Sequence, residues 1–168
     1  MNQFLPSHPV IDIHVHPLAC FGGNGVSSAQ EDARRLIEAG KRSGITKMVV
    51  FSLYTSTPYE PTHDQCVQAN DYVLAMRDSA PEVFIPFCYV TPAVPEQAVA
   101  EIQRCVGGAR MAGVKLWVAR KATDPGLDPI MQAAIDHDVP VLQHAWLKTT
   151  GNLPGESTPE DVANLARR

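Results

Sequence analysis

Three features of the sequence predict an α/β fold made of parallel strands and helices. Short apolar runs alternate with amphipathic stretches along the 168 residues. Helix-capping signals stand before most of the amphipathic stretches. The strand-then-helix pattern occurs five times, and parallel strands need crossover connections of this kind, which are right-handed. We therefore expect a single domain over residues 1–168, built from consecutive parallel β/α units.

The apolar runs supply the expected strands. They are rich in β-branched and other apolar residues, as is typical of strands that are buried in a parallel sheet. The third run is interrupted by Pro86. In chain order, the expected strands cover residues 10–15, 45–53, 82–90, 112–119 and 139–146.

The expected helices begin at recognisable caps. Ser28 and Thr62 each precede a Glu or Gln by three residues, which is the capping-box pattern. Pro95 suits the first turn of the third helix. Asp128, followed by Pro129, predicts the N-cap of the fourth helix, and Thr158 opens the last one.

Two architectures are compatible with this order of elements. Five β/α units make a complete flavodoxin-like open sheet, or five-eighths of a TIM-type (β/α)8 barrel, which needs about 250 residues. Neither G-x-G-x-x-G nor a P-loop follows the first strand. The absence of a phosphate-binding loop disfavours a flavodoxin-like nucleotide-binding protein.

Composition excludes several classes of function. Apolar residues make up 45% of the chain, charged residues 19%, and the net charge is -4. The sequence has no basic block and no apolar stretch of about 20 residues. We therefore expect no nucleic-acid or membrane partner and a small-molecule substrate instead. The N-terminus lacks the pattern of a secretion signal, so we expect a cytoplasmic protein. The widely spaced cysteines indicate reduced thiols.

The first strand carries an unusual polar face. Strand side chains alternate, so Asp12, His14 and His16 share one face, while Ile11 and its aliphatic neighbours share the other. In a barrel, the aliphatic face would pack on the outer helices and the histidines would lie at the catalytic, C-terminal end. Two imidazoles in this spacing can bind one metal ion, although a pair of structural histidines at a strand end explains H-x-H alone equally well.

Two further residues favour the metal site. Lys115 lies in the fourth expected strand between apolar neighbours, where a buried ammonium is costly, and His144 lies at the end of the fifth. Three histidines and a lysine at equivalent strand ends indicate a divalent metal centre, for which zinc suits imidazole ligands. Trp117, Trp146 and Lys148 are candidates to line a substrate pocket. The remaining histidines, His8, His63 and His137, are expected at the surface.

Together, "IDIHVHP", "GITKMVVFSL", "GVKLWVA" and "PVLQHAWLKTTGN" resemble the amidohydrolase 2 (amidohydrolase-related) family of the metal-dependent amidohydrolase superfamily. This resemblance implies a (β/α)8 barrel in which His14, His16 and His144 bind metal. Lys115 matches a lysine that is carboxylated in some branches, and Lys115 and His144 are the implied catalytic residues. Family members also have metal-site residues on later strands, and these have no counterpart within residues 1–168.

The resemblance implies a hydrolase in which metal-activated water attacks a carbonyl group. The second alternative is a nonoxidative decarboxylase of an aromatic or unsaturated acid, which the family also contains. We expect residues 1–168 to be the N-terminal five units of a longer barrel. A third alternative is an inactive fragment or noncatalytic α/β module, stabilised by pairing its open edge with another chain in a homo-oligomer.

Overall fold

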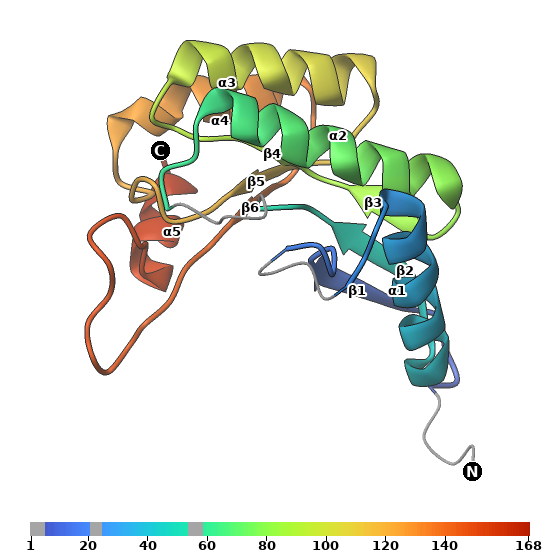
Figure 1. Ribbon diagram of the computed structural model, residues 1–168. Coiled ribbons are helices and arrows are strands. Elements are labelled where there is room, and N and C mark those ends of the chain that lie inside the picture. The colour runs from blue at the N-terminus through green and yellow to red at the C-terminus, as the bar shows by residue number, and fades with distance from the viewer. Residues whose placement is uncertain (1–5, 21–24, 54–58) are drawn as a thin grey trace.

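The computed structural model describes residues 6–20, 25–53 and 59–168, and it confirms the α/β class (Figure 1). Two parallel three-stranded sheets follow one another, in the order β1-β2-β3 and β4-β5-β6. Helices α2, α3 and α4 cover one side of the strands, as expected for a partial barrel. The strands are β1 (Val10–Val15), β2 (Ile45–Val50), β3 (Phe84–Pro86), β4 (Cys88–Tyr89), β5 (Val114–Leu116) and β6 (Val141–Gln143).

The third expected strand is two strands, which corrects the sequence-based count. β3 pairs with β2, whereas β4 pairs with β5 in the second sheet. Between them, the Phe87 backbone N–H donates to Val50 O at 2.9 Å, and that of Cys88 donates to Gly113 O at 2.8 Å. Because Pro86 has no N–H to donate, the hydrogen bonds that this run donates toward the β5 side begin at Cys88, while Phe87 still donates to β2.

The helix starts agree with the capping signals, with one exception. Thr62 and Thr158 form complete capping boxes, and the Ser28 hydroxyl accepts a hydrogen bond from Glu31 N. Asp128 is not an N-cap but the first residue of its helix, because a 3-10 turn capped by Asp124 precedes it. The helices are α1 (Ala29–Ser43), α2 (His63–Ser79), α3 (Pro95–Ile102), α4 (Asp128–Asp136) and α5 (Pro159–Leu165), and a π-helix (Gln103–Gly108) follows α3.

Gly44 ends α1 with φ at 72°, in the left-handed region that a Cβ disfavours. We expect Gly44→Ala to lower the free energy of unfolding by about 1 kcal/mol, whereas Ser43→Ala, one residue earlier in the helix, changes it by less than about 0.5 kcal/mol. Urea denaturation of the two variants checks this. Equal stabilities would show that the cap conformation costs alanine nothing.

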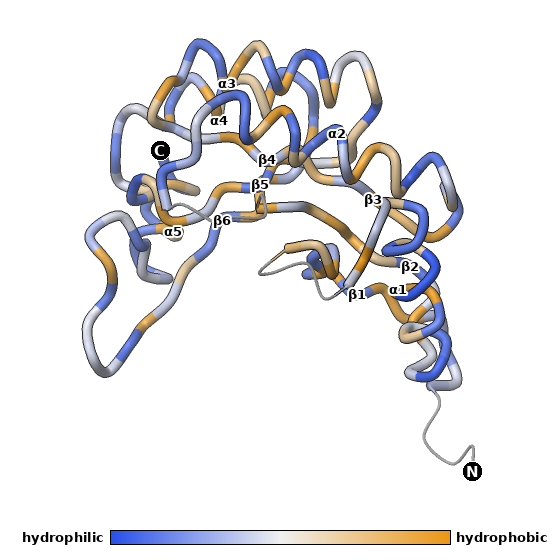
Figure 2. Tube along the Cα trace, viewed as in Figure 1, coloured by the Kyte–Doolittle hydropathy of each residue, from blue (hydrophilic) through white to orange (hydrophobic). Residues whose placement is uncertain are grey.

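The core lies between the strands and the helices that cover them. Figure 2 shows hydrophobic stretches along the strands, and the largest buried cluster includes Val50, Val73 and Ile102. A second cluster contains Val49 of β2 and Tyr89 of β4, together with residues of α2 and residues that follow β2 and β3. Neighbouring residues of β2 thus contribute to different clusters, as the alternation of strand side chains requires.

The expectation that the aliphatic face of β1 packs on the outer helices is wrong. Ile11 and Ile13 are 51% and 63% exposed instead of packed under a helix. β1 is an edge strand, and α1 packs against α2 and β2. Within the described ranges, no helix is both long enough and apolar enough to cross a membrane.

Candidate metal centre

Three histidines and a lysine from distant parts of the chain line one pocket. His14 and His16 belong to β1 and the residue that follows it, Lys115 lies in β5, and His144 follows β6. The pocket has a volume of about 280 Å³. Its lining consists of His14, His16, Leu53, Lys115, Trp117, His144, Ala145 and Trp146. All four residues that the sequence singled out for a metal or catalytic role therefore lie around one space.

The two β1 histidines are adjacent. Their ring centres are 5.1 Å apart, and both rings contact the edge or face of Phe51. His16 Nδ1 lies 3.2 Å from Phe51 O, and the backbone N–H of His14 donates to the Asp12 carboxylate. Burial lowers the pKa of His16 to about 4, and the positive charges of His14 and Lys115 act in the same direction. The ring is thus neutral at neutral pH, as a metal ligand must be.

Lys115 is a buried cation beside these rings. Its side chain is 1% exposed, and Nζ lies 4.9 Å from the centre of the Phe51 ring. In the part of the chain that the structure describes, no carboxylate forms an ion pair with it. Burial lowers its pKa to about 8, so Nζ can gain or lose a proton near neutral pH.

His144 contacts an acidic residue that the sequence analysis did not single out. The backbone N–H of His144 donates to Leu116 O at 3.0 Å, and its ring Nε2 lies 3.0 Å from Glu156 Oε1. Burial works against ionisation of Glu156, but hydrogen bonds from Lys148 and His144 lower its pKa to about 2. Glu156 lies in the loop before α5, where no periodic pattern marks a site residue.

The two tryptophans, Trp117 and Trp146, complete the pocket wall. Trp117 packs on Tyr59 with ring centres 5.3 Å apart, and Trp146 lies 6.1 Å from the His144 ring. Lys148 does not line the pocket, but its Nζ lies 5.7 Å from the Trp146 ring centre. The site thus combines imidazoles, an amine and two flat apolar surfaces.

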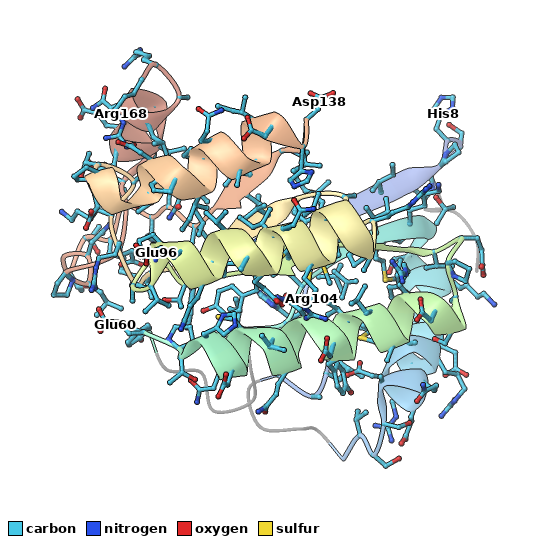
Figure 3. All side chains as sticks on the ribbon, turned by 90° about the horizontal axis from the view of Figure 1, so that it is seen from above. His8, Glu60, Glu96, Arg104, Asp138 and Arg168 are labelled. Carbon is cyan, nitrogen blue, oxygen red and sulfur yellow. The ribbon has the colours of Figure 1, made fainter. Side chains whose placement is uncertain are left out.

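The other histidines are not among the lining residues. His63 is the first residue of α2, and His8 lies exposed ahead of β1, as labelled in Figure 3. His137 caps the end of α4, and its Nε2 lies 2.9 Å from Gln103 Oε1.

The chemistry of the donor set fits a divalent transition metal, because imidazole is a preferred ligand of such ions. The ring nitrogens of His14, His16 and His144 are not all within 4.8 Å of one another. Binding one ion through all three therefore requires the side chains to move closer together.

A second group does meet that distance within the described residues: Cys88, Glu101 and Cys105, all buried. The Glu101 carboxylate already accepts hydrogen bonds from Arg104 at 2.7 and 2.8 Å and from Asn70 at 2.7 Å. Figure 3 labels Arg104 beside α3. Because a guanidinium already neutralises this carboxylate, the cluster is a hydrogen-bonded core network rather than a cation site.

Removing the charge of Glu101 is expected to destabilise the protein. Glu101→Gln leaves Arg104 with Asp71 as its only ion-pair partner among the described residues, and we expect the free energy of unfolding to fall by about 2 kcal/mol, less than for a fully buried pair because Arg104 is partly exposed. Chemical denaturation checks this, with Glu38→Gln at the exposed Arg34 pair as the control. Equal losses in both variants would mean that burial adds nothing to the Glu101 pair.

Comparison with protein families now places this chain. Residues 11–168, nearly the whole sequence, match the family model described as Amidohydrolase. The chain belongs to the amidohydrolase family. A comparison with curated proteins gives no significant match.

Solved structures similar to this amidohydrolase-family chain support the partial barrel. A protein of Staphylococcus aureus assigned as an amidohydrolase has a TM-score of 0.66 and 18% identity, over 95% of this chain and 56% of its own. A 5-carboxyvanillate decarboxylase of Novosphingobium aromaticivorans, in complex with manganese and a nitrobenzoic acid, has a TM-score of 0.58 and 26% identity, over 66% and 34%. A 4-oxalomesaconate hydratase of Rhodopseudomonas palustris has a TM-score of 0.60 and 15% identity, over 80% and 52%.

The amidohydrolase-family chain thus spans between about a third and just over half of the length of these structures. Two of them are named as enzymes of different reaction classes, and one contains manganese. The reactions in these names belong to the similar proteins, and membership of the family does not select one of them for this chain.

Proposed function

We propose that residues 1–168 form the metal-binding part of an enzyme that uses one divalent ion to transform a small carboxylate or carbonyl compound. The observation that supports this most directly is the position of His14, His16 and His144 around one pocket with Lys115. The three imidazoles would hold the ion, which supplies Lewis acidity to a substrate oxygen or to water. Zinc is the ion that suits this donor set, and manganese, present in one similar structure, is the alternative.

The residues around the histidines have separate roles in this proposal. The Lys115 ammonium binds a negatively charged group of the substrate, and with a pKa of about 8 it can also hold or release a proton at Nζ. Trp117 and Trp146 offer apolar walls against which a planar substrate can stack. The pocket therefore suits a planar acid better than a flexible aliphatic one.

Nonoxidative decarboxylation of an aromatic or unsaturated acid is the reaction that these features favour. Two tryptophans line the pocket, and the 5-carboxyvanillate decarboxylase is similar to this chain at 26% identity. In this reaction the bond between carbon and the carboxylate breaks, carbon dioxide leaves with its oxygens, and a proton adds to the carbon. Lys115 Nζ is the group of the pocket that can hold this proton.

Hydrolysis is the second candidate, and the description of the matching family favours it. It needs the same ion to activate water for attack on an amide or ester carbonyl. The substrate then gains the elements of water and releases no carbon dioxide, so product analysis separates the two reactions.

The test begins with metal-free protein, prepared with a chelator, and measures uptake of zinc and manganese. We expect about one equivalent, followed by metal-dependent release of carbon dioxide from hydroxylated benzoates. Amides and esters are assayed in parallel for hydrolysis. Failure to take up either ion would contradict the proposal and favour a noncatalytic α/β module.

A further inference from the structure

Glu156 forms a largely buried contact with the His144 ring. The Glu156 side chain is 2% exposed and that of His144 is 18% exposed, so little water competes for the hydrogen bond between them. His144 Nε2 lies 3.0 Å from Glu156 Oε1. An ionised carboxylate can only accept hydrogen bonds, so the imidazole must supply the proton from Nε2.

The second oxygen of Glu156 is held just as firmly. Oε2 lies 2.8 Å from Lys148 Nζ and accepts a hydrogen bond from Leu153 N at 3.1 Å. One carboxylate therefore has three partners, and Lys148 balances its charge. With both oxygens engaged, the carboxylate cannot rotate without losing hydrogen bonds in a buried place, which is costly.

The loop that carries Glu156 is itself tied to the strand end beside His144. Ala145 and Ser157 form a parallel bridge, and Trp146 N donates to Ser157 O at 2.9 Å. A Cβ at Gly155 would collide with the carbonyl oxygen of Val118, so the loop packs directly on the backbone that follows β5. These contacts set the position of Glu156 independently of the His144 side chain.

From this arrangement we propose that Glu156 is the positioning residue of His144, which holds the ring as the Nε2–H tautomer and leaves Nδ1 as the ligand atom. The inference rests on the proposed metal-binding function. A ring whose second nitrogen donates to a carboxylate is fixed in orientation and is a more basic ligand, and loss of such a partner costs about 10- to 100-fold in metal affinity.

The first measurement needs no metal. NMR of the metal-free wild-type protein with nitrogen-15-labelled histidine reports the tautomer of each ring directly. The His144 signals are assigned by their loss in His144→Gln. We expect the Nε2–H form of His144 in the wild type and a mixture of tautomers in Glu156→Gln, whose amide can accept or donate. A wild-type ring in the Nδ1–H form overturns the proposal without any further variant.

The second measurement is the affinity for manganese and zinc. We expect Glu156→Gln to weaken binding by about 10- to 100-fold and Glu156→Asp, which keeps the carboxylate, to restore part of it. Glu101→Gln is the matched control, because Glu101 is also a buried carboxylate paired with a cation but lies outside the pocket lining. In the Glu101→Gln variant, the tautomer signals of His144 and the metal affinity should equal those of the wild type.

Each outcome separates the two proposals. Equal metal affinity in Glu156→Gln and Glu101→Gln would show that Glu156 has only a structural role. A wild-type protein that takes up no metal, with His144 as the Nε2–H tautomer and that preference lost in Glu156→Gln, would contradict the proposed function and support the positioning of the ring by Glu156.

Discussion

Alanine in place of His14 or His16 is expected to abolish the retention of a divalent metal ion. Both imidazoles line the pocket with ring centres 5.1 Å apart, so each variant removes one of the three proposed ligands. Removal of one ligand should cost more than the loss of an outer partner, so we expect the dissociation constant to rise by more than about 100-fold. Metal content after gel filtration and a competitive titration measure this.

His137→Ala is the matched control for these variants. It also removes an imidazole, but His137 caps α4 and is not among the pocket-lining residues, so metal content should stay at the wild-type value. Stoichiometric metal in either the His14 or the His16 variant would remove these residues from the site.

Methionine in place of Lys115 is expected to stabilise the protein while removing the activity proposed above. The Lys115 side chain is 1% exposed, and burial lowers its pKa from 10.5 to about 8. Keeping the ammonium charged at neutral pH therefore destabilises the folded state. Methionine fills a similar volume without charge. We expect the free energy of unfolding to rise by about 2 kcal/mol at neutral pH, and turnover to become undetectable.

The pH dependence of this gain has a definite sign. Between about 8 and 10.5 the unfolded chain binds more protons at Lys115 than the folded protein does, so wild-type stability rises with pH in this window relative to the variant. The advantage of Lys115→Met is therefore complete below pH 8 and shrinks above it. Lys47→Met, at an exposed position of β2, should give no such profile. A destabilised Lys115→Met protein at neutral pH would mean that the ammonium is compensated by an interaction in the folded state.

The sequence alone determined the features that depend on residues close together in the chain. Capping at Ser28 and Thr62 is a contact over three residues, so the starts of these helices were predictable to the residue. The alternation of strand side chains placed His14 and His16 on one face, and the order of units predicted parallel strands. The family followed from the resemblance of short sequence stretches such as "IDIHVHP". These predictions need no knowledge of how distant segments pack.

Tertiary structure alone decided what depends on distant segments. The division of the third strand at Pro86 follows from which neighbour each half pairs with, and the exposure of Ile13 follows from the edge position of β1. The low pKa of Lys115 comes from burial by several elements at once. Glu156 reaches His144 because packing at Gly155 brings its loop back to the strand end. Burial and long-range contacts are properties of the whole packed chain, so no local pattern in the sequence encodes them.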